Sequence, residues 1–454
     1  MSLSIIILAA GQGTRMKSQL PKVLHRLAGR TLLDHVFFST SQLNARKTFV
    51  VYGYGGDLVP ETLSHLPVTW LEQKQQLGTG HAVQQAIPSI PDTDQVLVVY
   101  GDTPLITYQT LNLLVEAAKE SGFSLLTSIL ENPEGYGRII RDDDDSLIRI
   151  VEEKDASDEE RQICEINTGM MVVDAGHLKK WLEQLDNNNA QGEFYLTDII
   201  ALAVADSINI KTLKPSYPVE ILGINDRIQL AELERYYQTI QAHHLMKNGV
   251  TLMDPDRFDL RGDLEVGTDI NIDVNVIIEG KVSIGNNVSI GANCYIHNAE
   301  IADDTVILPN TMIENSIIGK RCRIGPFARI RPETRLADEV QIGNFVELKK
   351  SDIGTATKIN HLSYIGDSTI GQNVNIGAGS ITCNYDGAEK HQTIIEDDVF
   401  IGSDSQLIAP VTVGKGATIG AGTTITRDVA ANTLEHNKIS HTSVKDWKRP
   451  SRKK

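Results

Sequence analysis

Aliphatic residues recur at a period of six over most of the C-terminal half of this chain. From Val266 to Ile425, isoleucine, leucine or valine stands at every sixth position, with five-residue steps and one longer gap between runs. Glycine often follows, as in Ile284-Gly285 and Ile419-Gly420. A helix cannot use this period, because about 3.6 residues per turn would spread the side chains around its circumference. A left-handed parallel β-helix uses it directly, since each hexad forms one face of a triangular coil with its aliphatic residue inward. The sequence therefore predicts this fold.

The remaining length requires at least one further domain. At 454 residues the chain is too long for a single core. Apolar strand runs alternate with helical patterns over 1–227, which predicts an α/β domain with a Rossmann-like, mainly parallel sheet. Helically spaced apolar residues then predict a long α-helix over 228–248, joining this domain to the β-helix at 249–454.

Composition argues against several classes of protein. The formal net charge of −16 argues against a nucleic-acid binder, and no run approaches the ~18 apolar residues of a membrane span. Met1 leads directly into a strand, so we expect no secretion signal. Four dispersed cysteines without a Cys-x-x-Cys pair indicate reduced thiols in a cytoplasmic protein and argue against a zinc site. The basic tail at 445–454 is expected to be solvated rather than a binding arm.

Two segments depart from the regular patterns. The hexad count lapses between Ile381 and Ile394, and a long loop on a repeat scaffold is usually functional or disordered. Cys383 beside that loop is either a reactive thiol or a buried, inert one, and we expect the second. The acidic run Asp142–Asp145 lies between two strand-like segments, which predicts a hairpin tip rather than a metal site.

The first predicted strand ends in a glycine-rich loop. Leu8-Ala-Ala-Gly-Gln-Gly-Thr-Arg-Met16 is followed by Pro21-Lys22. Small residues let backbone N–H groups approach an anion at a helix start, while Arg15 and Lys22 add positive charge. The loop is not a dinucleotide fingerprint, because Met16 stands at the third glycine position, and no Gly-Lys-Ser/Thr closes it as a Walker loop. We therefore predict a phosphate cradle.

This combination resembles the sugar-nucleotide pyrophosphorylases, which carry Gly-x-Gly-Thr-Arg-Met followed by Pro-Lys. The resemblance implies transfer of a nucleotidyl group from UTP to a sugar 1-phosphate, with release of pyrophosphate. It also implies that Asp102 and Asn225 ligate Mg²⁺, an ion seldom fully caged by protein. The nucleotide and sugar contacts that it implies, which include the segment Gly135-Tyr-Gly-Arg138, are Leu8, Ala9, Ala10, Gly11, Arg15, Lys22, Gln73, Gly78, Thr79, Tyr100, Gly101, Asp102, Gly137, Glu152, Asn167 and Asn225.

Charged and polar residues also gather around the hexads and their long loop. Arg331, Lys349 and Lys390 are cations available to a sugar phosphate. His361 carries an imidazole, the side chain whose ordinary pKa lies near neutrality, so it can take a proton from an attacking amine. Glu347 is a candidate to orient that ring.

The cluster resembles the acetyltransferase half of the bifunctional N-acetylglucosamine-1-phosphate uridylyltransferase/glucosamine-1-phosphate acetyltransferase family. The likeness extends from Leu8 to about Arg449 in that family's domain order. It implies that His361 is the general base. The implied glucosamine 1-phosphate contacts are Arg331, Lys349, Tyr364, Asn375 and Lys390, and the implied acetyl-CoA contacts are Ala378, Asn384, Tyr385, Ser403, Ala421 and Lys438. Lys438 aligns with a position usually held by Arg, so the charge is kept but the bidentate fork is lost.

The resemblance thus implies an enzyme that acetylates glucosamine 1-phosphate with acetyl-CoA and couples the product, N-acetylglucosamine 1-phosphate, to UTP. It implies a homotrimer with active sites at subunit boundaries. Two alternatives remain open. One is a pyrophosphorylase whose β-helix is structural or regulatory, and the other is a scaffold that kept the fold without its chemistry. His361 with Asn384-Tyr385 argues against the first, and Asp102 with Asn225 argues against the second.

Overall fold

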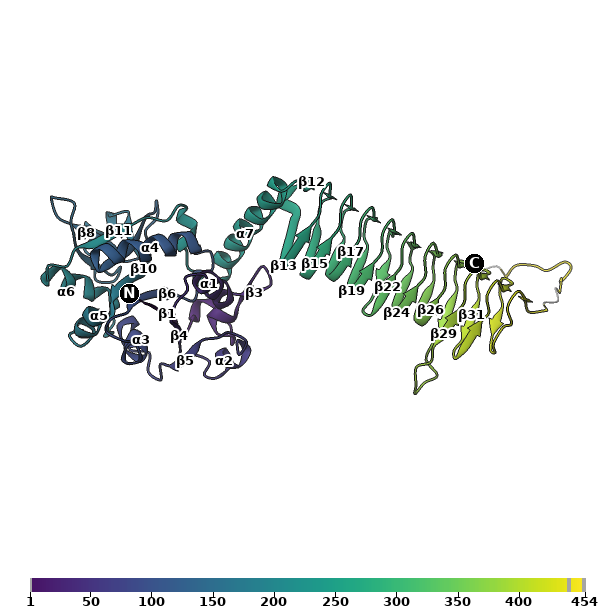
Figure 1. Ribbon diagram of the computed structural model, residues 1–454, viewed down its shortest axis with the longest axis horizontal. Coiled ribbons are helices and arrows are strands. Elements are labelled where there is room, and N and C mark those ends of the chain that lie inside the picture. Colours follow the sequence, from purple (N-terminus) through teal and green to yellow (C-terminus); the bar gives the residue numbers. More distant parts are fainter. Residues whose placement is uncertain (1, 439–441, 451–454) are drawn as a thin grey trace. The chain divides into compact units, whose positions relative to one another are not determined.

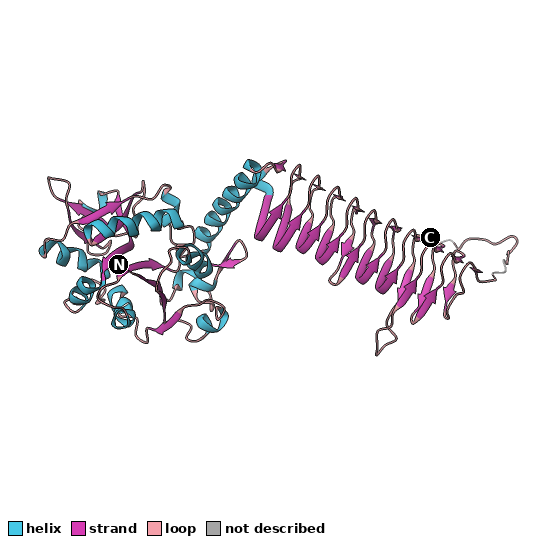
Figure 2. Cartoon of the chain, viewed as in Figure 1, coloured by secondary structure: helices cyan, strands magenta, loops and turns pink. Residues whose placement is uncertain are grey.

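The chain forms two compact units. The computed structural model describes residues 2–438 and 442–450, and the last residues of the basic tail lie outside this description. Contacts divide the chain into residues 1–237 and 238–454, and helix α7 (Arg227–Lys247) contributes to both. Figures 1 and 2 show a mixed α/β unit and a unit built almost entirely of stacked strands. No helix in the described part of the chain is long and apolar enough to cross a bilayer.

Unit 1 is built on a mainly parallel sheet, as the sequence predicted. The strand order is β11-β7-β10-β6-β1-β4-β5, and the β10 strand alone on this path runs antiparallel to its neighbours among the described strands. These strands span Leu3–Ala9 (β1), Lys47–Tyr52 (β4), Thr69–Glu72 (β5), Gln95–Tyr100 (β6), Phe123–Ile129 (β7), Glu165–Asp174 (β10) and Ile210–Leu213 (β11). A separate pair joins β2 (Arg26–Leu27) to β3 (Arg30–Thr31).

Helices cover both faces of this sheet because alternate residues of each strand point to opposite sides. In β1, Ile5 and Ile7 join one core cluster, whereas Ile6 and Leu8 join the other. The first cluster is closed by α1 (Leu32–Ser41), α2 (Leu58–Thr62) and α4 (Tyr108–Ser121). The second is closed by α3 (Thr79–Ala86), α5 (Ala175–Leu182) and α6 (Ile199–Ala205).

The acidic run forms a hairpin tip, as predicted. Strands β8 (Arg138–Arg141) and β9 (Leu147–Val151) pair antiparallel around it. Asp142 Oδ1 accepts the Ser146 N–H at 2.8 Å, and Asp145 adopts a positive φ of 62°. The run therefore closes a turn.

Unit 2 is a parallel β-helix, and its coils are stacked in two long sheets. One sheet contains the short strands β12 (Thr251–Leu252), β14 (Asn271–Ile272), β16 (Ser289–Ile290), β18 (Val306–Ile307), β20 (Arg323–Ile324), β23 (Gln341–Asn344), β25 (Lys358–His361), β27 (Asn375–Ile376), β30 (Phe400–Ile401), β33 (Thr418–Ile419) and β35 (Leu434–Glu435). The other contains β13 (Phe258–Val266), β15 (Val276–Ile284), β17 (Tyr295–Ile301), β19 (Met312–Ile318), β21 (Arg329–Ile330), β22 (Thr334–Leu336), β24 (Glu347–Ile353), β26 (Tyr364–Ile370), β28 (Ile381–Cys383), β29 (Thr393–Ile395), β31 (Gln406–Ile408), β32 (Val411–Val413) and β34 (Thr424–Ile425).

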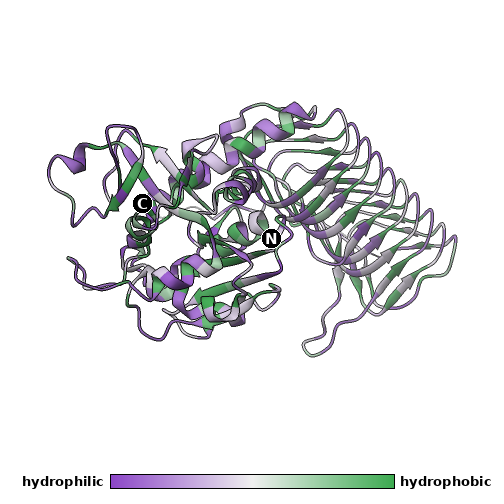
Figure 3. Cartoon of the chain, turned by 60° about the vertical axis from the view of Figure 1, so that its left-hand side comes forward, coloured by the Kyte–Doolittle hydropathy of each residue, from purple (hydrophilic) through white to green (hydrophobic). Residues whose placement is uncertain are grey.

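The periodic aliphatic residues form the core of this unit, which confirms the prediction from the hexads. Ile278, Ile296 and Ile359 are fully buried. A second residue of each hexad also points inward, two positions earlier, because alternate strand residues share a face. This second position is often small or polar, as at Thr357 and Ser363. Figure 3 shows the hydrophobic segments recurring on successive strands.

The predicted loop is an excursion from one coil that leaves the stack in register. Before it, Ser351 pairs with Ser368, and the paired strands join residues 17 or 18 positions apart. Across it, Ser368 pairs with Thr393, and the contacts join residues 25 positions apart. Within the excursion, Tyr385 and Lys390 form an antiparallel bridge. The inserted residues therefore fold as a small hairpin that projects from the coil.

Candidate active sites

A cavity of about 650 Å³ lies at the carboxyl end of β1, where open α/β sheets place their ligands. The glycine-rich loop forms one side of it. Residues after β5 and β6 form much of the remainder. The predicted residues that line this cavity are Leu8, Ala9, Ala10, Gly11, Arg15, Lys22, Gln73, Gly78, Thr79, Tyr100 and Asp102.

The glycine-rich loop leads into a single 3-10 turn, Thr14–Met16, and not into the longer helix that a phosphate cradle was expected to start. So short a turn has little helix dipole, and attraction for an anion must come from loop N–H groups and the cations Arg15 and Lys22. Gly13 has a φ of 62°, and a Cβ there would lie 2.7 Å from Lys22 Cβ. Glycine at this position therefore lets the loop close over Lys22.

Lys22 contacts both predicted metal ligands. Its ammonium group donates to Asp102 Oδ2 and, at 3.0 Å, to Asn225 Oδ1. The two oxygens thus converge on one cationic group at the edge of the cavity. Across the described residues, no group of three or more His, Cys, Asp and Glu side chains forms a candidate metal site. A carboxylate and an amide oxygen beside this cavity fit a partly hydrated Mg²⁺, which takes its other ligands from phosphate and water.

A second cavity of about 300 Å³ adjoins the first and shares Arg15, Thr79, Tyr100 and Asp102 with it. Of the remaining predicted contacts, all but one line this second cavity. These are Gly137, Glu152, Asn167 and Asn225. The exception is Gly101, which lines neither cavity; its N–H donates to Leu8 O at 2.9 Å and holds the two strand ends together.

Glu152 is the most unusual acid of the second cavity. Burial raises the pKa of its carboxyl group, while a hydrogen bond from Thr197 Oγ1, 2.9 Å away, opposes that effect. Arg138, from the expected sugar-binding segment, does not line this cavity. It is buried and pairs with Glu153 at 2.8 Å.

Some lining residues were missed by the sequence reasoning. Gln191 and Glu193 reach the first cavity from the loop before α6, and Thr197 lines the second. No local motif marks them, because their place depends on the fold of a loop more than a hundred residues from the glycine-rich segment.

On the β-helix, five residues occupy the same position of successive coils. Each lies two residues after an inward isoleucine, and the pairing of strands β23, β25, β27, β30 and β33 places them in one line. In order, the line contains Asn344, His361, Ala378, Ser403 and Ala421. His361 is exposed, and only small side chains follow it toward Ala421. Asn375 lies on the same sheet, paired between Lys358 and Phe400.

The other predicted sugar-phosphate contacts form a second group: Arg331 directly follows β21, Lys349 lies on β24, Tyr364 on β26 and Lys390 in the excursion. Arg331 and Lys349 occupy matching positions of adjacent coils, and Tyr364 follows on the next coil. The nearby Lys390 ammonium lowers the pKa of Lys349, because two like charges destabilise one another. This concentration of positive charge suits a phosphate group.

The excursion is held by a carboxylate at its tip. Asp386 Oδ1 accepts the N–H groups of Ala388 and Glu389, each at 2.8 Å, and Oδ2 meets His391 Nε2 at 2.7 Å. These contacts hold the pKa of Asp386 far below its usual range. At the base of the loop, Asn384 Nδ2 donates to Asp367. Tyr385 is exposed and donates to Gly387 O at 2.6 Å.

Among the described contacts no hydrogen bond joins Glu347 to His361, although Glu347 was expected to orient that ring. Its carboxylate accepts a hydrogen bond from Arg331 Nη1 at 2.7 Å. Asn344 Oδ1 lies 3.0 Å from His361 Nδ1 instead. Lys438 is exposed beyond β35, next to residues 439–441, which are not described.

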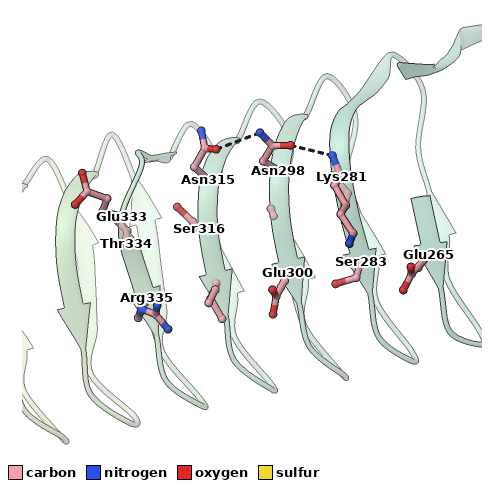
Figure 4. Close-up of a pocket in the computed structure, with 13 residues that line it drawn as sticks. Glu265, Lys281, Ser283, Asn298, Glu300, Asn315, Ser316, Glu333, Thr334 and Arg335 are labelled. Carbon is pink, nitrogen blue, oxygen red and sulfur yellow. Dashed lines mark hydrogen bonds between the residues drawn. The ribbon is translucent and has the colours of Figure 1, made fainter. Parts of the chain in front are cut away.

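A separate groove of about 600 Å³ crosses the coils nearer to α7 (Figure 4). Asparagine side chains link its coils: Asn298 Nδ2 donates to Asn315 Oδ1 at 3.2 Å, and Lys281 N–H donates to Asn298 Oδ1 at 2.9 Å. None of the predicted site residues lines it. These contacts stabilise a corner of the stack.

Known proteins match the chain over both units. Residues 5–140 match the MobA-like NTP transferase domain, 260–346 the GMPPB C-terminal domain, and 392–427 the bacterial transferase hexapeptide repeats. The chain is 56% identical over 453 residues to the bifunctional protein GlmU of Methylococcus capsulatus, a match that covers 100% of this chain and 98% of that protein. The chain belongs to the GlmU family. It is a bifunctional enzyme, with a nucleotidyltransferase domain followed by a hexapeptide-repeat transferase domain.

Two solved structures give weaker matches to this chain. A nucleotidyl transferase from Methanothermobacter is 17% identical with a TM-score of 0.37, covering 55% of this chain and 99% of its own. HddC from Yersinia pseudotuberculosis is 18% identical with a TM-score of 0.39, covering 52% and 99%. Neither score is high enough to support a conclusion about fold or function.

Proposed function

We propose that this enzyme makes UDP-N-acetylglucosamine in the cytoplasm by two reactions at separate sites. The β-helix, 249–454, transfers acetyl from acetyl-CoA to glucosamine 1-phosphate. The α/β domain, 1–227, transfers uridylyl from UTP to the resulting N-acetylglucosamine 1-phosphate, and the helix at 228–248 joins them. The observation that carries the proposal is the 56% identity to a bifunctional enzyme over the whole chain.

For uridylyl transfer, the two adjoining cavities supply places for the nucleotide and the sugar phosphate. UTP occupies the larger cavity, with its phosphates along the glycine-rich loop and its base near Gln73. The sugar occupies the smaller one, against Gly137, Glu152 and Asn167. A phosphate oxygen of the sugar attacks the α-phosphorus of UTP, the bond to the β-phosphate breaks, and pyrophosphate leaves. Such a step depends on positioning and charge neutralisation.

Three cationic groups would neutralise this charge. Arg15 and Lys22 approach from the loop and the segment after it, both lining the larger cavity. Asp102 and Asn225 would hold Mg²⁺, which would neutralise further charge on the phosphates. The convergence of both side-chain oxygens on the Lys22 ammonium supports this ligand pair.

For acetyl transfer, His361 takes a proton from the amine of glucosamine 1-phosphate. The amine nitrogen attacks the thioester carbonyl, the carbon–sulfur bond breaks, and coenzyme A leaves as a thiolate. Arg331, Lys349, Tyr364, Asn375 and Lys390 hold the sugar phosphate. The cofactor follows the line of small residues, with contacts at Ala378, Asn384, Tyr385, Ser403, Ala421 and Lys438.

We propose that this second site is completed in a homotrimer. His361 belongs to the line on one sheet, whereas Arg331, Lys349 and Lys390 gather on the other sheet and the excursion. Packing one β-helix against another would bring the excursion of one subunit toward the line of its neighbour. Sedimentation that shows a fully active monomer would refute this arrangement.

The two sites are tested with one variant in each. His361→Ala is expected to lower acetyl transfer by about 10²–10⁴-fold, the usual contribution of a general base, while uridylyl transfer stays near wild type. Asp102→Ala is expected to do the reverse. His297→Ala is the matched control, since His297 lies on strand β17 of the same β-helix and has no proposed role. Loss of both activities from either single variant contradicts separate sites.

A further inference from the structure

His361 has one side-chain neighbour that fixes its ring. Asn344 and His361 end strands β23 and β25 and are register partners on adjacent coils. Asn344 Oδ1 lies 3.0 Å from His361 Nδ1, across 17 positions of sequence. The following residue of the line, Ala378, carries only a methyl group. The ring is therefore held on one side by an amide and left open on the side where the small residues begin.

We propose that Asn344 is the positioning residue of the acetyl transfer, an inference that rests on His361 being the general base. A neutral imidazole has one N–H donor and one acceptor nitrogen. The Asn344 carbonyl oxygen accepts from Nδ1, which keeps the proton on that nitrogen and leaves the lone pair on Nε2. That lone pair then takes the proton of the substrate amine. The hydrogen bond also fixes the plane of a ring that is otherwise exposed.

The other candidate for this role is already occupied. Glu347 is bound to Arg331 at 2.7 Å, and Arg331 belongs to the cationic group that suits a phosphate. The two strands that flank His361 bring no charge to it, since β23 reads Gln-Ile-Gly-Asn and β27 reads Asn-Ile. On its own strand the charged neighbour is Lys358, which is exposed. A neutral amide therefore selects the tautomer without adding a negative charge beside the ring.

The first test is Asn344→Ala. We expect kcat for acetyl transfer to fall by about 10–100-fold, as when an orienting partner of a functional histidine is removed. The KM values for glucosamine 1-phosphate and acetyl-CoA are expected to stay within about twofold, because Asn344 contacts the base and not the substrates. Uridylyl transfer by the same polypeptide reports that the α/β domain is folded, and circular dichroism reports that the β-helix is folded. The matched control is Asn286→Ala, because Asn286 also links adjacent coils, accepting from Thr268 N–H at 3.0 Å.

The second test is Asn344→Asp, which separates positioning from a structural role. A carboxylate accepts the same Nδ1 proton, so most of the activity is expected to return. Its charge stabilises the imidazolium, so the acidic limb of the pH profile of kcat/KM should move upward by about one pH unit or more. An Asn344→Ala enzyme with wild-type kcat overturns the proposal. So does an Asn344→Asp enzyme that is as slow as Asn344→Ala with an unchanged pH profile.

His361→Ala distinguishes these outcomes from failure of the proposed function. If His361→Ala retains acetyl transfer, the base itself is misassigned. If His361→Ala is inactive and Asn344→Ala is fully active, only the positioning role is wrong.

Discussion

Ile359 provides a sharp test of the β-helix core. It is fully buried, and strand pairing stacks it between Ile342 on the preceding coil and Ile376 on the next. Lys358 precedes it on the same strand and points outward. The two positions are adjacent on one strand of one coil and differ in burial.

The expected magnitudes follow from burial. Ile359→Ala removes three carbon atoms, worth about 0.8 kcal/mol each on transfer, and the cavity left behind raises the loss to about 2–5 kcal/mol. Ile359→Val removes one and should cost about 0.5–1.5 kcal/mol. Lys358→Ala, at an exposed position, should change the free energy of unfolding by no more than about 0.5 kcal/mol.

Urea unfolding followed by circular dichroism, at one fixed protein concentration, measures these differences. Acetyl and uridylyl transfer along the same titration identify which unit has unfolded. We expect Ile359→Ala to lower the urea concentration at which half of the acetyl transfer is lost, and to leave the corresponding midpoint for uridylyl transfer near that of the wild type. Equal destabilisation by Lys358→Ala and Ile359→Ala would refute the inward assignment of the hexad residue.

Three further predictions concern the two sites. Lys22→Met should strengthen Mn²⁺ binding to the nucleotide-free enzyme by at least about 5-fold in calorimetry, because the ammonium group no longer competes for Asp102; weaker binding would contradict this. Asp386→Ala should raise the KM values for acetyl transfer and speed proteolysis of the excursion at pH 7. In the wild type, the contacts that hold the excursion require the Asp386 carboxylate, so they should persist until the pH falls through the lowered pKa of Asp386. Glu152→Gln should raise the melting temperature at pH 8 but hardly at pH 4. Burial disfavours the ionised carboxyl group of Glu152, so this group destabilises the wild type only as the pH rises and the carboxyl group ionises. Equal effects at both pH values would count against this prediction.

The sequence predicted those features of the fold that depend on hydrophobic periodicity. The hexads, the parallel sheet, the hairpin at Asp142–Asp145 and the long excursion were all predicted. The second inward position was not, because a residue such as Ser363 has no hydrophobic signal and is buried only by its place on the strand. The 3-10 turn after the glycine-rich loop was also missed, since its glycine pattern is shared with loops that start long helices.

The candidate sites were predictable where residues follow a recognisable motif. The loop around Arg15 and the strand end at Asp102 belong to this class. Asn344 does not, because its contact with His361 depends on the length of one coil, which becomes visible only when the strand register is known. The roles of all these site residues stay predictions until the variants are assayed.

The stacking of coils fixes the distances between side chains along the β-helix axis. Adjacent parallel strands lie about 4.8 Å apart, so the three steps from His361 to Ala421 span about 14 Å. Distances along this axis change only in whole increments of one turn. An extended cofactor whose reactive end must meet the imidazole therefore has to span a fixed number of coils. Segments can be added at a corner, as at Cys383, without altering that spacing. Duplicating a single coil between His361 and Ala378, in contrast, would move Ala378, Ser403 and Ala421 one coil farther from the imidazole and out of the cofactor's reach.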